Sequence, residues 1–114
     1  MIAKLETMKT EKREKMRDGN GVITLTHLFS KDDMLGKSRM VASLSLPKGA
    51  SIGVHDHVKE AEMYIITSGV ATVTENGKEY TLEKGEAMFT GNGDNHSIEN
   101  RGDEELTLYA VIFN

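Results

Sequence analysis

Short β-type segments separated by glycine, asparagine and aspartate turns are the feature that most constrains the fold of this chain. Val22 to Phe29 and Met40 to Leu46 are rich in apolar and β-branched residues, and every second residue from Met40 onward is apolar. Such alternation is typical of a strand with one buried face. Leu106 to Phe113 is apolar on both faces, so we expect a buried strand there. With no convincing long helix, the pattern predicts an all-β antiparallel sandwich or barrel of about eight strands.

Two turn signals divide the middle of the chain. Gly69 lies inside the longest β-type run, Met63 to Thr74, and a glycine in that position indicates a bulge or a sharp bend. Asn76 and Gly77 separate this run from the strand-like segment Lys78 to Leu82. An Asn-Gly pair between two strand patterns predicts a type I′ hairpin turn.

With 114 residues, the chain is long enough for one domain with one hydrophobic core and too short for two. We expect residues 1–21 to form a charged N-terminal arm, either solvated or paired as an edge strand. Glu11 and Lys15 are spaced so that a loose helical turn near residues 9–17 is an alternative. After this arm, residues 22–114 are expected to form a single β-barrel domain.

The composition excludes several classes of partner. The net charge is −4 and basic residues are interleaved with acidic ones, so no nucleic-acid partner is expected. No apolar run approaches the roughly 20 residues of a membrane span, and the charged N-terminus lacks the apolar core of a signal peptide. We therefore expect a cytoplasmic protein without a membrane partner. The absence of cysteine removes disulfides, thiolate metal sites and cysteine nucleophiles.

Three of the four histidines lie in two short segments, and a glutamate accompanies them. His55 and His57 are two residues apart, so both imidazoles lie on the same face of an extended chain. Glu62 follows His57 at an odd spacing, which would place it on the opposite face of one continuous strand. We therefore expect the chain to turn back between them, so that Glu62 begins the next strand. His96 would reach the same point from a later hairpin.

Imidazole and carboxylate side chains are common ligands of transition metals in proteins. Three neutral imidazoles and one carboxylate around a divalent ion give a site charge of about +1 and suit Mn, Fe, Co, Ni, Cu or Zn without choosing among them. An octahedral ion would keep two positions for water or substrate. A bidentate anion such as a carboxylate or an enediolate would fill both. The residues therefore predict a site for one divalent metal ion whose identity stays open.

The same two segments resemble the two sequence motifs of the cupin superfamily. The first motif has a glycine, a His-x-His pair, a glutamate and a closing glycine at fixed spacing, and Gly49 to Gly69 matches each position. The second motif is matched by Gly85, Gly93, His96 and Asn100. Gly91 stands where the family usually has proline.

The resemblance implies a double-stranded β-helix, also called a jelly-roll barrel, as the fold. It implies that the metal ligands are His55, His57, Glu62 and His96. It also implies that the glycines of the two motifs and Asn100 form turns and barrel corners. Cupins often exchange or pair flanking strands across a dimer, so a homodimer is expected.

Within this superfamily the chain is most similar to single-domain proteins grouped with oxalate decarboxylases. Those enzymes carry an arginine shortly before the His-x-His pair, where this chain has Ser51 to Val54. Arg39, on an earlier strand, is an alternative for that role. The other interpretation of Arg39 is a surface arginine beside Asp33 or another acid.

Glu60 and Tyr64 are the candidate catalytic residues, because the short chain offers few other acids or bases near the predicted ligands. Tyr64 is expected to point inward, either as a wall of the cavity or as an acid. Met40 and Met88 are expected to line the same cavity. His27 stands in a β-type run without a partner motif, so a structural or surface role is expected for it.

Three functions fit these residues. The first is a mononuclear metalloenzyme acting on a small anionic or carbonyl substrate, as a decarboxylase, a dioxygenase or an isomerase. The second is a non-catalytic, metal-dependent module that binds or senses a small molecule. The third is a storage or structural protein in which the metal only braces the barrel. A fold alone does not separate these functions, because function belongs to the site.

Overall fold

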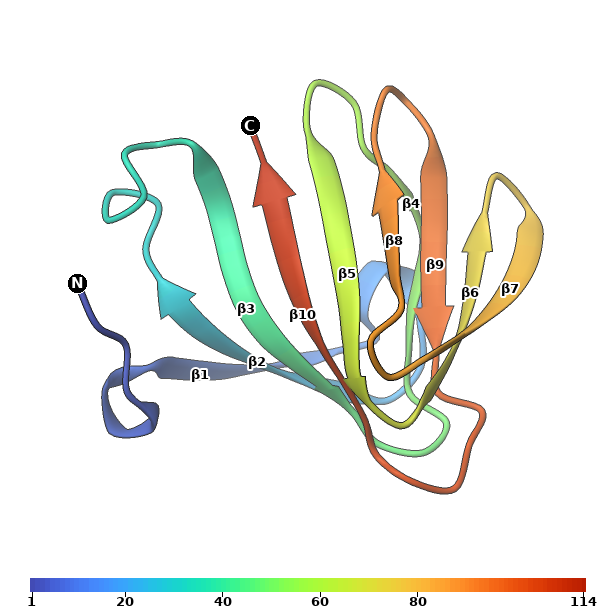
Figure 1. The fold of residues 1–114 in the computed structure, drawn as a ribbon. Helices are drawn as coiled ribbons and strands as arrows, with labels where there is room; N and C mark the ends of the chain where they lie inside the picture. Colours follow the sequence, from blue (N-terminus) through green and yellow to red (C-terminus); the bar gives the residue numbers. More distant parts are fainter.

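Two antiparallel β-sheets face one another in the structure, a computed structural model that describes all 114 residues (Figure 1). In chain order the elements are η1 (Leu5–Thr7), β1 (Lys9–Glu14), η2 (Met16–Asp18), β2 (Val22–Phe29), β3 (Ser38–Leu46), β4 (Ser51–Asp56), β5 (Ala61–Ser68), β6 (Val70–Glu75), β7 (Lys78–Glu83), β8 (Ala87–Thr90), β9 (Asn95–Glu99) and β10 (Leu106–Phe113). The larger sheet has the order β1-β2-β3-β10-β5-β8, and the smaller has the order β4-β9-β6-β7. The elements η1 and η2 are single 3-10 turns, and no helix is long and apolar enough to cross a membrane. The all-β jelly roll predicted from the sequence is confirmed.

The core lies between the two sheets and contains eighteen buried apolar side chains. Alternation along β3 places every second side chain from Met40 to Leu46 in this core, as the sequence pattern predicts. β10 lies in the middle of the larger sheet, between β3 and β5, and also buries alternate residues. On its other face, Tyr109 and Phe113 remain 42% and 40% exposed. The expectation of a strand buried on both faces is therefore wrong for the outer face of β10.

Of the two alternatives that the sequence pattern leaves open, the sandwich is formed, and the barrel that the family resemblance implies is not closed. The larger sheet ends at β1 and β8 and the smaller ends at β4 and β7, so neither sheet continues into the other. β8 has only four residues and pairs with β5 alone, which leaves no ladder between β8 and β7. The chain instead passes between the sheets through several connections, one of which bends at Gly69 between β5 and β6. The molecule is thus an open two-sheet sandwich (Figure 1).

Two turns predicted from the sequence are present. Gly69 has φ +80° and makes the bend between β5 and β6. Asn76 and Gly77 have φ values of 50° and 83° and join β6 to β7, with Glu75 paired to Lys78. Positive φ at both central residues is the property of a type I′ turn, so the predicted hairpin is confirmed.

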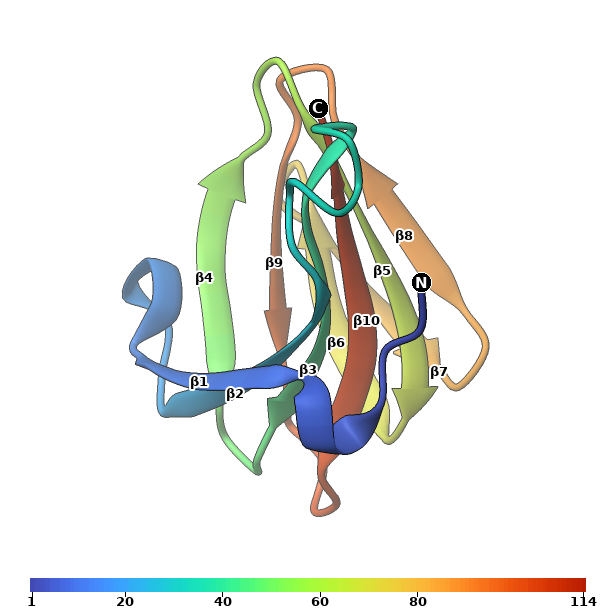
Figure 2. The same ribbon diagram turned by 90° about the vertical axis from the view of Figure 1, so that its left-hand side faces the viewer.

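The middle of the N-terminal arm forms a strand at the edge of the larger sheet. β1 pairs with β2 from Lys9 opposite His27 to Glu14 opposite Val22, and all six of its side chains are exposed. His27 Nε2 lies 2.8 Å from Glu11 Oε1 across this pair, in keeping with the structural role expected for His27. The loose helical turn considered for residues 9–17 is not formed, because strand pairing satisfies this backbone. The chain then crosses to the smaller sheet, where η2 lies beside β4 (Figure 2).

Candidate metal centre

β4, β5 and β9 bring the four predicted ligands together. His55 of β4 pairs directly with His96 of β9, so two neighbouring strands place both imidazoles side by side. His57 follows the end of β4, and residues 58–60 turn the chain before Glu62 enters β5. Because β5 belongs to the opposite sheet, Glu62 faces the imidazoles across the interior. This is the chain reversal that the odd spacing predicts.

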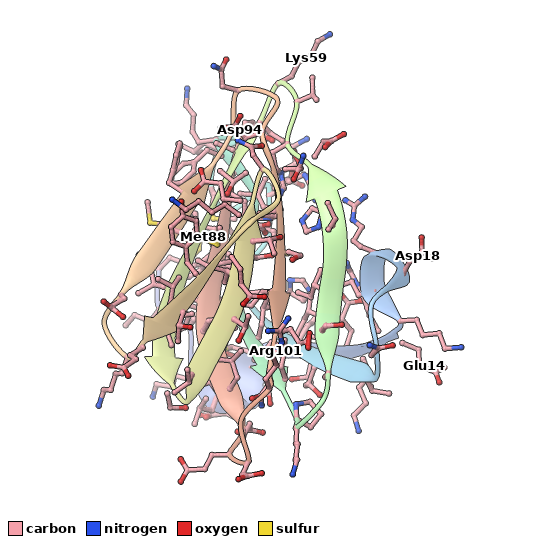
Figure 3. The ribbon with its side chains drawn as sticks, turned by 90° about the vertical axis from the view of Figure 1, so that its right-hand side faces the viewer. Glu14, Asp18, Lys59, Met88, Asp94 and Arg101 are labelled. Carbon is pink, nitrogen blue, oxygen red and sulfur yellow. The ribbon has the colours of Figure 1, made fainter.

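Two loops meet at the end of the sandwich next to these residues. His57 N donates a hydrogen bond to Asp94 O at 3.1 Å, and Gly93 N donates to His57 O at 2.9 Å. Figure 3 labels Lys59 and Asp94 in these loops, close together at one end of the molecule. The two backbone hydrogen bonds therefore fix His57 although it lies just beyond β4.

The ligand atoms of the four residues converge on one point, and we call His55, His57, Glu62 and His96 the metal-binding cluster. His96 Nε2 lies 2.9 Å from His55 Nε2, 3.0 Å from His57 Nε2 and 3.0 Å from Glu62 Oε1. Glu62 Oε1 lies 3.0 Å from His57 Nε2 and 3.6 Å from His55 Nε2. Adjacent ligand atoms around an octahedral ion with bonds of about 2.1 Å are about 3.0 Å apart. The distances therefore fit a single transition-metal ion.

Hydrogen bonds at the other ring nitrogens identify the atoms that face the centre of the cluster. His55 Nδ1 donates to Gly53 O at 2.8 Å, and His57 Nδ1 donates to Glu60 Oε1 at 3.3 Å. A neutral imidazole carries one N–H, so the Nε2 atoms of both rings turn lone pairs toward the centre. His96 Nδ1 is buried and has no hydrogen-bond partner in the protein. Lone pairs and a carboxylate this close together are stabilised by a cation, so the donor set fits a metal ion.

Burial and neighbouring charges set the ionisation of the cluster. Burial opposes ionisation of Glu62, but its polar contacts with His55 and His96 and the nearby imidazole charges outweigh it and lower the pKa of Glu62 to about 2. Burial lowers the pKa of His96 below its ordinary value of 6.5, although its hydrogen bond with Glu62 opposes this effect. At neutral pH the cluster therefore presents an ionised Glu62 and a neutral His96, which are the forms that bind a metal.

Tyr64, one of the two candidate catalytic residues, lines the cavity beside the cluster. Its ring stacks on that of His96, with centroids 4.8 Å apart and planes 10° from parallel. Burial raises the pKa of Tyr64 well above its ordinary value, and the charge of Glu62 adds to this effect. Tyr64 is therefore a neutral phenol that packs against one member of the cluster.

Glu60, the other candidate, is not part of the cavity wall. Its two carboxylate oxygens accept hydrogen bonds from Arg39, each 2.8 Å long. These bonds are the largest cause of a lowered pKa for Glu60, so its carboxylate stays ionised. Through its contact with His57 Nδ1, Glu60 orients one member of the cluster. Arg39 is thus a half-exposed arginine beside an acid, although that acid is Glu60 and not Asp33.

A small cavity of about 40 Å³ lies against the cluster. Met40 lines it, as expected, but Met88 does not. The N-terminal arm adds Arg13, Met16 and Arg17 to the lining, and sequence reasoning missed all three. They are far from the histidines along the chain, and only the pairing of β1 with β2 and the docking of η2 on β4 bring them here. The charge pattern of the arm carries no local signal of this role.

Two motif residues explain how the loops around the site are held. The side-chain amide of Asn100 donates to Leu46 O at 2.9 Å and to Glu104 O at 2.8 Å, so it ties the loop before β10 to the end of β3. A Cβ at Gly91 would lie 2.8 Å from Ala61 Cβ. The close approach of this loop to β5 thus accounts for a glycine at a position where the family usually has proline.

A two-sheet jelly roll that buries a cluster of three histidines and one glutamate defines a class of small β-proteins with a metal-binding interior. Residues 42–112 match the family model of the Cupin domain, so the chain belongs to the cupin family. The resemblance seen in the two sequence motifs is thereby confirmed.

Individual relatives align with most of the length of this chain. The oxalate-binding protein of Thermotoga maritima is 38% identical over 112 residues, which are 98% of this chain and 93% of that protein. The crystal structure of a predicted oxalate decarboxylase from Thermotoga maritima superposes with a TM-score of 0.95 at 38% identity, over 99% of this chain and 98% of that one. A sugar phosphate isomerase of the cupin superfamily from Silicibacter pomeroyi shares the fold, with a TM-score of 0.76 at 18% identity over 98% of this chain and 74% of that one.

Proposed function

We propose that this protein binds a small dicarboxylate, with oxalate as the first candidate, at a divalent metal ion held by the metal-binding cluster. The observation that carries the proposal is the convergence of four ligand atoms, within 4.8 Å of one another, beside a cavity. Three imidazoles and Glu62 would hold the ion. The bound ion would supply a positive charge and Lewis acidity that attract carboxylate oxygens.

The size and charge of the cavity support a very small anion. A volume of about 40 Å³ has room for about three water-sized groups, which favours a very small ligand over one as large as a sugar phosphate. Three of the residues around the cavity are arginines. The relative named as an oxalate-binding protein covers almost the whole chain, so its ligand is the natural first candidate.

Decarboxylation of the same ligand is the second candidate function, and the related crystal structure described as a predicted oxalate decarboxylase favours testing it. Releasing carbon dioxide from oxalate requires a proton for the remaining fragment. Glu60 is poorly suited to supply it, because Arg39 keeps its pKa low. Tyr64 holds its proton tightly, because burial raises its pKa. Binding without turnover is therefore the function that these residues support best.

The experiment begins with elemental analysis of the purified protein and a titration of chelator-treated protein with Mn²⁺, Fe²⁺, Co²⁺, Ni²⁺, Cu²⁺ and Zn²⁺. We expect about one ion per chain and saturable oxalate binding by calorimetry only when a metal is bound. Equal oxalate binding by the metal-free chain, or no metal binding at all, would contradict the proposal. Formate and carbon dioxide are measured in the same samples. Their release in catalytic amounts would replace binding with decarboxylation as the function.

A further inference from the structure

Three arginines line the cavity beside the metal-binding cluster, and only one of them is free of an acidic partner. Arg39 is bound through two hydrogen bonds to Glu60, and Arg13 Nη2 lies 2.8 Å from Glu11 Oε1. Arg17 forms no ion pair with an acidic side chain of the protein. The positive charge of Arg17 is thus left for another partner at the mouth of the cavity.

The segment that carries this arginine, residues 15–19, is a strained turn, which we call the Arg17 turn. Lys15, Arg17 and Asp18 have φ values of 48°, 54° and 62°. These values lie in the left-handed region that residues with a side chain disfavour. Strain of this kind persists only where the surrounding structure holds it, and it is concentrated at functional sites.

Contacts with β4 hold the Arg17 turn in place. Ser51 N donates to Asn20 O, and Asn20 N donates to Ser51 Oγ, each at 2.9 Å. A Cβ at Gly53 would overlap Arg17 O, so the turn touches the β4 backbone at a place where only glycine fits. Met16 packs against the hydrophobic core from the same turn. Figure 3 labels Asp18 at the tip of the turn, next to β4.

The charges around the cavity match a dianion better than a monoanion. A divalent ion with the Glu62 carboxylate leaves a charge of about +1, and Arg17 adds another positive charge. One carboxylate at the ion and one at the guanidinium would balance both charges.

We propose that Arg17 binds the second carboxylate of the ligand and thereby makes this protein select dicarboxylates over monocarboxylates of the same size. This inference rests on the proposed function, because it concerns the same ligand at the same metal. A guanidinium binds a carboxylate through two parallel N–H donors, which gives both charge and orientation. The Arg17 turn is then the part of the site that the N-terminal arm supplies, and the strain in its backbone serves to hold the guanidinium at the cavity.

The test compares oxalate with glycolate, which is similar in size and has one carboxylate, by calorimetry on the full chain loaded with Mn²⁺. Arg17→Met is the test variant. Lys15→Met is the matched control, because it removes a positive charge from the same turn at a residue outside the cavity lining. Arg17→Met should weaken oxalate binding by about 10-fold or more and glycolate binding by about 2-fold or less. Lys15→Met should leave both within about 2-fold, and the Mn²⁺ affinity should stay unchanged in both variants.

The outcomes separate this inference from the proposed function. Failure of the wild-type chain to bind oxalate would overturn both. Oxalate binding by the wild type with equal affinities in Arg17→Met and Lys15→Met would overturn the role of Arg17 and leave the proposed function standing. Thermal melting of each variant checks folding. Should Arg17→Met fail to fold, Arg17→Gln provides the same comparison with a polar side chain.

Discussion

Glu60 and Glu62 are two residues apart and have different parts in the site. Glu62 is buried, and its Oε1 lies 3.0 Å from the Nε2 atoms of both His57 and His96. Glu60 faces outward, accepts two hydrogen bonds from Arg39, and touches His57 only at Nδ1. One carboxylate is thus placed to bind a metal ion directly, and the other is placed to orient a ligand of that ion.

The same isosteric change at these two positions should therefore have graded effects on metal affinity. Glu60→Gln should weaken Mn²⁺ binding by about 10–100-fold, because it weakens the hydrogen bond that orients His57. Glu62→Gln should weaken it more, since it removes a charged ligand. Calorimetric titration of both variants with Mn²⁺ measures the two losses. Equal affinities, or the larger loss in Glu60→Gln, would show that Glu62 is not a ligand.

The stability of the metal-free protein should fall in acid, because both Glu62 and His96 have lowered pKa values. The pKa of Glu62 is about 2 in the folded chain against an ordinary 4.5. Its contribution to the free energy of unfolding is therefore complete above pH 4.5 and is lost as the pH falls toward 2. That contribution is on the order of 3 kcal/mol. The pKa of His96 is lowered from 6.5, so a separate loss begins as the pH falls below 6.5.

Urea unfolding of chelator-treated protein between about pH 8 and about pH 3 measures these losses. Glu62→Gln has no carboxyl group to titrate at this position, so it should reduce the loss below pH 4.5, leaving the part due to Glu60 and Glu11, and keep the loss below 6.5. A variant whose stability falls as steeply as that of the wild type below pH 4.5 would contradict the role assigned to Glu62.

Residue types and spacing were sufficient to predict the cluster but not its surroundings. The pair His55 and His57 share a face because of strand geometry, and the odd spacing to Glu62 requires a turn. The bond between Arg39 and Glu60 depends instead on where β3 lies relative to the loop after β4, which no local pattern records. Arg17 is the extreme case, because its position depends on a strained turn docked on a distant strand.

At the scale of the elements, Gly69 allows one β-type run to serve both sheets. Its φ is +80°, and a Cβ there would lie 2.5 Å from Glu105 O and 3.0 Å from Leu106 Cα. The bend between β5 and β6 therefore packs directly against the backbone that leads into β10. A glycine at this corner satisfies both a backbone conformation and a close contact.

Alanine substitutions separate these two requirements. Gly69→Ala should lower the free energy of unfolding by about 3 kcal/mol, because positive-φ strain and a clash with backbone atoms add together. Gly77→Ala is the matched control, since Gly77 has φ +83° and a Cβ added there would meet no atom within 4 Å. Gly77→Ala should lower the free energy of unfolding by only about 1 kcal/mol, because only the positive-φ strain applies there. Urea unfolding measures both, and equal losses would mean that the contact with the backbone before β10 is unimportant.

The strands differ in how well the sequence predicts them. β2, β3 and β10 were predicted because apolar residues alternate or continue along them. β1 was not distinguished from a solvated arm, because all six of its side chains are charged or polar and exposed, and only its backbone is satisfied by β2. The sequence pattern leaves sandwich and barrel open as alternatives, because closure depends on whether β8 is long enough to pair on both edges.

At the scale of the whole molecule, the outer face of the larger sheet carries an apolar surface without a partner in the chain. Phe89, Tyr109 and Phe113 are 56%, 42% and 40% exposed, and the rings of Phe89 and Phe113 lie 6.2 Å apart. Val111 and Met63, which are paired between β10 and β5, lie half-buried on the same face. Contiguous apolar surfaces of this kind mark sites of protein association. This surface is where we expect the predicted homodimer to form.

Substitution of a single tyrosine on this surface should separate the dimer. Tyr109→Glu would bury an unpaired carboxylate in an apolar interface, which is unfavourable enough to prevent association at micromolar concentration. Val70 of β6 is equally exposed, at 43%, but belongs to the other sheet and lies outside the hollow that Phe89 lines, so Val70→Glu is the matched control. Size-exclusion chromatography with light scattering should give twice the chain mass for the wild type and Val70→Glu, and the single-chain mass for Tyr109→Glu. A wild-type protein that stays monomeric, or equal dissociation of both variants, would contradict this placement of the interface. Because the metal-binding cluster lies on the inner side of the sandwich, both variants should keep their metal affinity, and this separates loss of the dimer from loss of the fold.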